Sequence, residues 1–229
     1  MRTEILRKLN AERAARRGSV LVTHLAGGEQ RLVPEAEIAG DALAGELAQA
    51  LATGKSGIVQ TPGGEVFLNV HVPSPRVVVI GAVHIAQAFA PMARIAGFDV
   101  TIVDPRTAFA TPDRFEGEEV VAEWPEPVLS RRPLDAYTAL VAVTHDPKID
   151  DLPLQEALRA GCFYVGALGS RKTHGRRVER LLAAGCSEAE IARIEAPIGL
   201  DIAAATPAEI AVAVLGSVVR ALRRRGAPA

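Results

Sequence analysis

Residues 76–86 read RVVVIGAVHIA, and this stretch decides the fold. Four of its first five residues, 77–80, form a β-branched run, which is typical of parallel strands that are buried on both faces. Gly81 then allows a tight turn. Residues 84–96 predict a helix, and Gly97 ends it. A buried strand, a glycine turn and a helix are the first parts of a βαβ unit, so this stretch predicts a parallel sheet.

The same alternation of strands and helices continues downstream. Further strands are predicted at residues 99–104, 119–122, 136–144 and 162–166, and further helices at 151–160 and 170–184. Two capping boxes, at 187–190 and 206–209, begin a short helix and the last helix. This spacing of elements predicts fold class α/β, with a Rossmann-type doubly wound parallel sheet.

The first third of the chain has a different pattern. It predicts an amphipathic N-terminal helix, two hairpins and a helix, with strands at 19–25, 30–33, 58–60 and 65–72 and the second helix at 41–52. Pro73 and Pro75 hold the backbone extended and cannot donate to a strand ladder. We therefore expect a smaller N-terminal α+β domain at 1–73 and a Rossmann-type nucleotide-binding domain at 76–229.

Composition excludes several classes of protein. The 229 residues are 48% hydrophobic and 23% charged, with 26 basic and 27 acidic side chains, which gives no reason to expect a nucleic-acid or membrane partner. No apolar run reaches about 18 residues, and no secretory signal is visible, so we expect a cytoplasmic protein. The two cysteines are expected to be free thiols, and no metal-binding motif occurs.

The first candidate site is the turn Gly81-Ala82-Val83-His84. It occupies the place of a dinucleotide fingerprint, G-x-G-x-x-G/A, in which the central glycine lets the backbone approach a pyrophosphate. Val83 stands where that glycine belongs. Two interpretations stay open: the free N–H groups of the helix N-terminus still bind an anion, or the fold persists with a degenerate cofactor site.

The second candidate is Asp104, at the end of the next strand. It follows Gly81 by about the spacing at which an acidic residue binds ribose hydroxyls. The alternative is a strand-end carboxylate that caps its own turn, since Asp104 precedes Pro105. Arg106 could pair with a phosphate through its planar guanidinium, or simply cover the surface.

The third candidate, Thr144 with His145, opens the polar run THDPKID at the end of the fourth predicted strand. Open parallel sheets bind ligands just beyond such strand ends. A histidine there can exchange protons near neutral pH or bind a metal. The alternative is a polar turn whose histidine is satisfied internally.

The fourth candidate is Gly169-Ser170-Arg171-Lys172, between the fifth predicted strand and a basic helix. Gly169 permits a sharp turn, and Ser170 can cap the helix. Arg171 and Lys172 add positive charge where the helix dipole already favours anions. This combination favours a phosphate or pterin-phosphate site over an ordinary βα turn followed by a solvated basic helix.

Taken together, these segments resemble the XdhC/CoxI family of accessory proteins, over roughly residues 73–220. Five motifs in the family's order carry the resemblance: residues 76–86; 103–106 with 109–112 and 114–115; 144–150; 164–173; and 196–202 with 206–212. Two features depart from the family pattern. Its fingerprint usually reads G-A-G-H-V/I-A, whereas Val83 stands here, and its N-terminal domain usually carries a cysteine, whereas none precedes Cys162.

The resemblance implies binding of molybdenum cofactor, as molybdopterin or its dinucleotide, and delivery of it to a molybdenum hydroxylase such as xanthine or carbon monoxide dehydrogenase. It also implies a cysteine desulfurase as a partner in sulfuration of the cofactor, and a homo-oligomer, often a dimer. From the residues we expect a binding protein rather than a turnover enzyme. Phosphates would contact Gly81–His84 and Gly169–Lys172, a ribose would contact Asp104, and the ligand head would face His145.

Two other hypotheses remain at this stage. One is an NAD(P)-dependent oxidoreductase, which Val83 disfavours because a branched side chain would crowd the diphosphate. The other is a degenerate Rossmann scaffold that serves only for protein contact.

Overall fold

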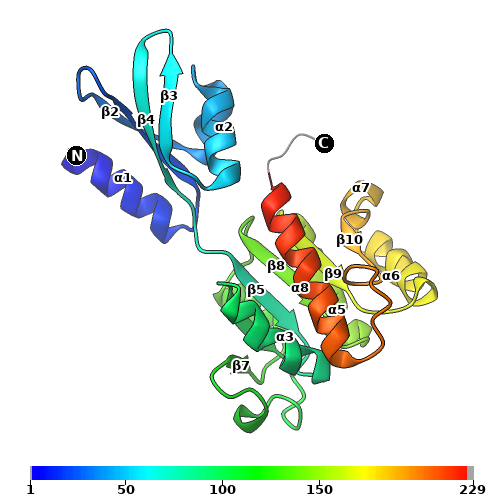
Figure 1. The fold of residues 1–229 in the computed structure, drawn as a ribbon. Coiled ribbons are helices and arrows are strands. Elements are labelled where there is room, and N and C mark those ends of the chain that lie inside the picture. The colour runs from blue at the N-terminus through cyan, green and yellow to red at the C-terminus, as the bar shows by residue number, and fades with distance from the viewer. Residues whose placement is uncertain (1, 226–229) are drawn as a thin grey trace. The chain divides into compact units, whose positions relative to one another are not determined.

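The computed structural model describes residues 2–225, which fall into two compact units (Figure 1). One unit comprises the described residues up to Pro73 together with those from Arg223 onward, and the other comprises Ser74–Leu222. The last turn of the final helix is thus grouped with the N-terminal unit, whereas the sequence pattern assigns it to the Rossmann domain.

The N-terminal unit is a small α+β fold, as the sequence predicts. Its four-stranded antiparallel sheet has the order β2-β1-β4-β3, with β1 (Ser19–His24), β2 (Gln30–Pro34), β3 (Gly57–Thr61) and β4 (Gly64–His71). The helices are α1 (Thr3–Ala14), the 3-10 helix η1 (Glu35–Gly40) and α2 (Ala44–Thr53). Its core joins Leu47 of α2 to alternate residues of the strands, such as Val20, Val22, Val66 and Leu68, because one face of a strand repeats every second residue.

The second unit is built on a six-stranded parallel sheet, which confirms the Rossmann-type prediction. Its order is β10-β9-β8-β5-β6-β7, with β5 (Arg76–Ile80), β6 (Asp99–Val103), β7 (Glu119–Val121), β8 (Thr138–Ala142), β9 (Tyr164–Ala167) and β10 (Ile194–Glu195). The chain runs outward from β5 to β7 and then returns to place β8 on the other side of β5. The boundary between β5 and β8 is therefore the topological switch point, where such sheets bind ligands.

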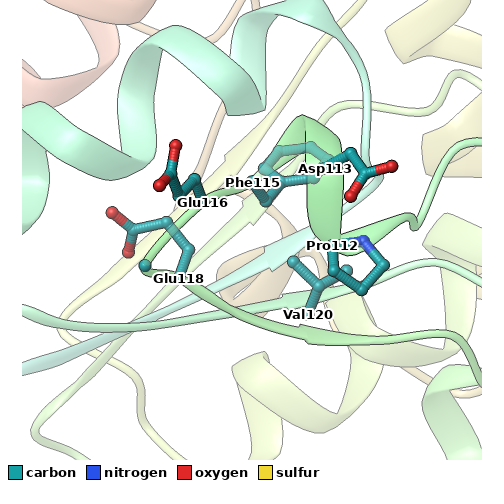
Figure 2. A pocket seen from close by; sticks show the side chains of 7 residues that line it. Pro112, Asp113, Phe115, Glu116, Glu118 and Val120 are labelled. Carbon is teal, nitrogen blue, oxygen red and sulfur yellow. The ribbon is translucent and has the colours of Figure 1, made fainter.

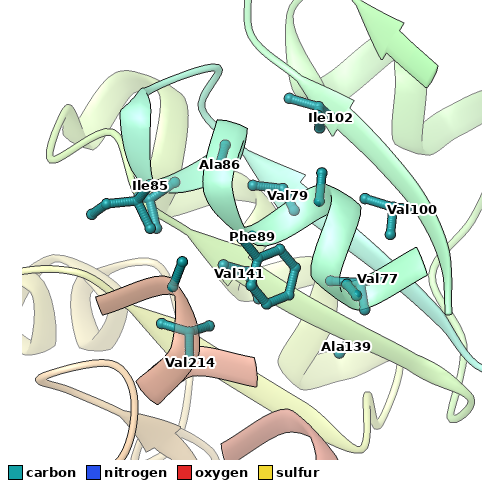
Figure 3. Packing of buried hydrophobic residues seen from close by; sticks show 14 of the residues in the cluster. Val77, Val79, Ile85, Ala86, Phe89, Val100, Ile102, Ala139, Val141 and Val214 are labelled. Carbon is teal, nitrogen blue, oxygen red and sulfur yellow. The ribbon is translucent and has the colours of Figure 1, made fainter. Parts of the chain in front are cut away.

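Helices cover both faces of this sheet. The helices of the unit are α3 (His84–Ile95), the 3-10 helix η2 (Pro112–Arg114), α4 (Pro125–Arg131), α5 (Pro147–Arg159), α6 (Arg171–Ala183), α7 (Glu188–Ile191) and α8 (Pro207–Arg224). On one face, Phe89 of α3 and Val214 of α8 pack on Val79 and Val141 of the central strands (Figure 3). Residues one position along, such as Val78 and Leu140, face α4, α5 and α6 on the other side.

Three details of this unit bear on the sequence prediction. Helix α5 begins at Pro147 rather than at 151, because the carboxylate of Asp146 accepts the Lys148 N–H and proline suits the first helical position. Three short elements, η2, α4 and β10, are absent from the prediction, since none is long enough to show a hydrophobic period. Cys162 and Cys186 are buried free thiols that pack in the core, as expected.

The strands of the sheet also end in register. Ile80 of β5 pairs with Val103 of β6 and with Ala142 of β8, and Ala142 pairs in turn with Ala167 of β9. Because all these strands are parallel, the residues that follow them lie along the same edge. This carboxyl edge carries every candidate site residue that the sequence indicates.

Candidate functional site

The turn after β5 is closely packed against the end of β8. Gly81 has a φ of +116°, and a Cβ at that position would lie 2.7 Å from Cγ2 of Thr144. Only glycine combines this backbone angle with so close an approach. The turn and the end of β8 therefore meet directly at the switch point.

Val83 has a backbone that suits valine. It is the N-cap of α3, in an extended conformation with φ of −96°, and its partly buried side chain packs against the hydrophobic core. The position therefore does not require glycine for conformational reasons. His84, the first residue of α3, is exposed at the N-terminus of the helix.

Asp104 is fully buried beneath the same turn. Its Oδ2 accepts the Ala82 N–H at 2.7 Å, and its Oδ1 accepts the Arg106 N–H at 2.9 Å. The Arg106 guanidinium donates to both carboxylate oxygens, from Nε at 2.9 Å and from Nη2 at 2.7 Å. Burial raises the pKa of Asp104. The hydrogen bonds together lower it by more than burial raises it, so the pKa of Asp104 lies below the ordinary value.

These hydrogen bonds affect two residues that the sequence predicts to contact a ligand, Ala82 and Asp104. Ala82 is as fully buried as Asp104, and its carbonyl accepts from Nη1 of Arg114 at 3.0 Å. In this conformation both residues support the turn, which is the turn-capping alternative for Asp104, and a ribose could reach the carboxylate only if Arg106 released it. The spacing in the sequence could not show this, because it does not reveal what lies between Asp104 and the surface.

Arg106 belongs to a small cationic and aromatic group at this edge. Its guanidinium lies 4.5 Å from the ring centre of the half-exposed Phe109, and the Arg114 guanidinium lies 5.6 Å from the same ring. Hydrogen bonding to Asp104 raises the pKa of Arg106, so its charge is permanent. The segment after β6 thus folds back and places two cations beside the Gly81 turn.

At the end of β8, Thr144 and His145 occupy the centre of the edge. The Thr144 hydroxyl donates to Oδ1 of Asp150 at 2.7 Å and accepts the Asp146 N–H at 3.0 Å. His145 has a φ of +66° and an exposed side chain. Desolvation by its neighbours and the charge of Arg177 lower the pKa of His145 below its ordinary value, which favours the neutral ring at physiological pH.

The turn after β9 lies beside His145. Gly169 has a φ of +136°, and a Cβ there would lie 3.8 Å from Nδ1 of His145. Ser170 caps α6, because its hydroxyl accepts the Thr173 N–H at 3.2 Å. Arg171 and Lys172 are both exposed in the first turn of the helix. This turn therefore offers positive charge to solvent, as the sequence predicts.

Two residues that the sequence pattern does not reveal lie just behind this turn. Asp150, in the first turn of α5, is 1% exposed, and Arg177, in the middle of α6, is 2% exposed. Both line a pocket of about 190 Å³ together with His145, Pro147, Asp151, Thr173, Arg176 and Arg180. The sequence pattern indicates a solvated basic helix here. The period of apolar residues in α6 does not distinguish an arginine that points inward from one that points outward.

A larger hollow, of about 550 Å³, lies over the segment that links β6 to β7 (Figure 2). Its lining includes the carboxylates of Asp113, Glu116 and Glu118. Acidic side chains repel phosphate, so this hollow is a poor candidate for the predicted anion site. Across residues 2–225 there is no group of three or more His, Cys, Asp or Glu side chains that could hold a metal ion.

The matching family model is described as the XdhC Rossmann domain, and it spans residues 77–218 of this chain. The chain belongs to the XdhC family. The match includes all the candidate segments at the carboxyl edge and both buried residues of the pocket. It thus confirms the family that the five sequence motifs indicate.

Three relatives of this XdhC-family chain are informative. It is 32% identical over 146 residues to the molybdenum cofactor insertion chaperone PaoD of Escherichia coli K12, and 29% identical over 153 residues to a protein of Bacillus subtilis 168 described as a probable subunit of xanthine dehydrogenase. It is also 30% identical over 155 residues to the uncharacterized protein YqeB of E. coli K12. The matches cover 64%, 66% and 68% of this chain but only 40%, 44% and 29% of the respective relatives.

A solved structure shares the fold. The crystal structure of a xanthine dehydrogenase from Bacillus halodurans superposes with a TM-score of 0.63 at 21% sequence identity, covering 97% of this XdhC-family chain and 65% of that chain. This likeness shows the fold alone. Within residues 2–225, no helix is both long enough and apolar enough to span a membrane.

Proposed function

We propose that this protein binds molybdenum cofactor, or a related phosphorylated pterin or nucleotide, and assists the maturation of a molybdenum hydroxylase. The observation that carries this proposal is the arrangement at the carboxyl edge. Two glycine turns that lead into helices flank the polar end of β8 in one parallel sheet, in register with each other. Such turns present backbone N–H groups and a helix dipole to phosphates.

The residues of this edge fit the chemistry of such a ligand. N–H groups at the start of α3 and α6 can donate to phosphate oxygens, and Arg171 and Lys172 supply exposed positive charge. Gly169 lets the backbone turn sharply, and Ser170 fixes the start of α6 through its bond to Thr173. His145, neutral and exposed between the turns, would face the head of the ligand.

The other contacts follow from the same arrangement. Val83 and His84 lie at the start of α3, Thr144 lies at the end of β8 in the centre of the edge, and Arg106 supplies a further cation. Ala82 and Asp104 hold the Gly81 turn from beneath. A site at the surface, where exposed cations bind the ligand, suits a carrier that must release its ligand to a partner. The partners we propose are the hydroxylase client, a cysteine desulfurase and a second copy of this chain.

Similarity to an insertion chaperone supports this function over catalysis of a redox reaction. An NAD(P)-dependent oxidoreductase would need a ribose partner at the end of β6, yet both oxygens of Asp104 are engaged by Arg106 and by backbone N–H groups. Titrating NADH and NADPH against the purified protein, followed by fluorescence, discriminates the two. We expect no saturable binding of either coenzyme.

The decisive test is a cofactor analysis of protein purified under anaerobic, reducing conditions from cells that make molybdenum cofactor. We expect molybdopterin, detected as its fluorescent oxidation product, to copurify with the wild type. The double substitution Arg171→Ala with Lys172→Ala should reduce it severalfold. Arg159→Ala is a matched control, because Arg159 is an exposed helical arginine at the far end of α5. Protein that carries neither molybdopterin nor any nucleotide would refute the proposal.

A further inference from the structure

Asp150 and Arg177 are buried close to each other, yet no hydrogen bond joins them. Each is hydrogen-bonded on one side: Oδ1 of Asp150 accepts the Thr144 hydroxyl at 2.7 Å, and Nη2 of Arg177 donates to the Leu168 carbonyl at 2.8 Å. No group within residues 2–225 bonds to Oδ2 of Asp150 or to Nε and Nη1 of Arg177. Buried charged atoms are normally paired, so these three atoms call for a partner.

Both side chains line the pocket of about 190 Å³ between α5 and α6. This volume is several times the share of one water molecule in the liquid, about 30 Å³, so it admits a small polyatomic ion. Arg180, at its rim, is neutralised by Asp151 through hydrogen bonds of 2.5 and 3.0 Å. With that pair balanced, the remaining charged side chains of the pocket are Arg176, Arg177 and Asp150, so the lining has a net charge of about +1 when Asp150 is ionised and about +2 when it is protonated.

The protonation of Asp150 decides whether the lining accepts an anion. Burial raises the pKa of Asp150 to about 6, against the opposing effects of the Thr144 hydrogen bond and the Arg177 charge. A protonated carboxyl group is a hydrogen-bond donor, like the N–H groups of Arg177. Near or below this pH the pocket thus presents donors and positive charge, which are complementary to an oxyanion.

We propose that this pocket binds a tetrahedral oxyanion of the phosphate class, with the unpartnered N–H groups of Arg177 and a protonated Asp150 as buried donors and Arg176 at the entrance. This goes beyond the function proposed above, because it needs neither the pterin nor the turn residues Arg171 and Lys172. The phosphate could be a free ion or a group carried by a larger ligand, and the chemistry of the pocket is the same for both.

Binding of such an anion requires Asp150 to hold a proton, so the affinity depends on pH. Several titratable and charged groups face Asp150 or its partner and share this electrostatic environment: His145 and Asp146 before α5, Asp151 on α5, Arg106 after β6, and His174 and Arg180 on α6. The test must therefore separate the titration of Asp150 from that of His145.

Sulfate is the suitable probe, because it keeps its double negative charge over the whole pH range used. Isothermal titration calorimetry at constant ionic strength should show saturable binding of sulfate by the wild-type protein. The affinity should fall by about tenfold for each pH unit above about pH 6, since the proton on Asp150 must then be taken up on binding. Absence of saturable binding at millimolar sulfate would overturn the proposal.

Variants assign the binding to the pocket. Asp150→Asn still accepts the Thr144 bond and donates at every pH, so it should bind sulfate without the loss above about pH 6. Arg177→Lys keeps the charge but not the planar donor set and should weaken binding at least about tenfold. Arg176→Gln, at the exposed rim, should weaken binding less and serves if Arg177→Lys fails to fold.

Two controls complete the test. Arg159→Gln, outside the pocket, should bind sulfate as the wild type does. His145→Asn, which tolerates the left-handed backbone of His145, should retain the pH dependence. A pH dependence that survives Asp150→Asn but is lost in His145→Asn would overturn the role of Asp150.

Inorganic phosphate and adenosine monophosphate distinguish the two sources of the oxyanion. Tighter binding of the nucleotide supports a phosphate group on a larger ligand, and equal binding supports the free ion. Binding of either that Arg177→Lys does not weaken would refute the site. Because none of these probes is molybdopterin, the inference can fail while the cofactor proposal stands, and the reverse also holds.

Discussion

The turn after β5 and the turn after β9 occupy equivalent places in their βα units but have opposite surroundings. The first is supported from beneath by a buried carboxylate, Asp104, whose oxygens are used by Ala82 and Arg106. The second is capped only by Ser170, exposes Arg171 and Lys172, and lies in front of the pocket that contains Arg177.

This comparison teaches that a glycine fingerprint and a ligand surface are separate properties. The Gly81 turn has the required place in the fold, and much of its hydrogen-bonding capacity is spent on the protein itself. The Gly169 turn lacks the dinucleotide pattern but keeps its cations free for a ligand. The following predictions test whether the first turn acts mainly in stability and the second mainly in binding.

The largest effect is expected for Asp104→Ala. It leaves the Ala82 N–H and the Arg106 guanidinium without their buried partner, which should lower the free energy of unfolding by about 3–5 kcal/mol. Because the folded-state pKa of Asp104 lies below the ordinary value, its ionic contribution is present above the unfolded-state pKa, about 4, and is lost as pH falls through the folded-state pKa.

Chemical denaturation across acidic and neutral pH measures both the loss of unfolding free energy and its dependence on pH. Asp104→Asn should be destabilised at neutral pH, and its difference from the wild type should shrink below about pH 4. A variant as stable as the wild type at neutral pH would contradict the structural role of this carboxylate.

The next effect concerns Asp150, whose pKa shifts in the opposite direction. Its folded-state pKa is raised to about 6, so its favourable contribution is full below the unfolded-state pKa, near 4, and is lost as pH rises to about 6. The neutral Asp150→Asn should therefore gain stability relative to the wild type as pH rises, by up to about 3 kcal/mol. Thermal unfolding as a function of pH tests this, and equal pH profiles for the two proteins would contradict it.

A smaller effect should separate the two glycines. Gly81→Ala forces alanine into a φ of +116° and brings Cβ to 2.7 Å from Thr144, which should cost about 2–3 kcal/mol. Gly169→Ala also has a positive φ, but its nearest contact, 3.1 Å, is to the side chain of Thr173, so it should cost about 1–2 kcal/mol.

Gly175→Ala is the matched control for these two glycines. Gly175 lies inside α6, and a Cβ there would have no packing neighbour within 4 Å, so alanine should stabilise the protein by about 0.5–1 kcal/mol. Urea denaturation of the three variants measures the free energy of unfolding of each and so gives the order of their stabilities. Equal costs for Gly81→Ala and Gly169→Ala would remove the difference in packing that we infer for the two turns.

The smallest effect on stability is expected for Arg171→Ala with Lys172→Ala. Both side chains are exposed, so the free energy of unfolding should change by less than about 0.5 kcal/mol. The same double variant should nevertheless lose cofactor in the copurification test. Loss of stability comparable to that of Asp104→Ala would instead assign these cations to the fold.

Much of the fold could be predicted from the sequence because its signals are local. The β-branched run at 77–80, the glycine after it and the alternation that follows predict a parallel sheet, and two prolines mark its start. The predicted start of α5 is four residues too late because Asp146 and Pro147 resemble a turn until the cap at Lys148 is visible. The short α4 and β10 carry too few residues to show a period.

The sequence by itself determined the strand–turn–helix order and which segments follow the strands, since these depend on neighbours along the chain. Only the tertiary structure decided that Asp104 would be buried beneath the Gly81 turn, and that Asp150 and Arg177 would face one pocket from different helices. The reason is physical. Burial, and with it the pKa of Asp150, is set by groups far away in the sequence that packing brings together.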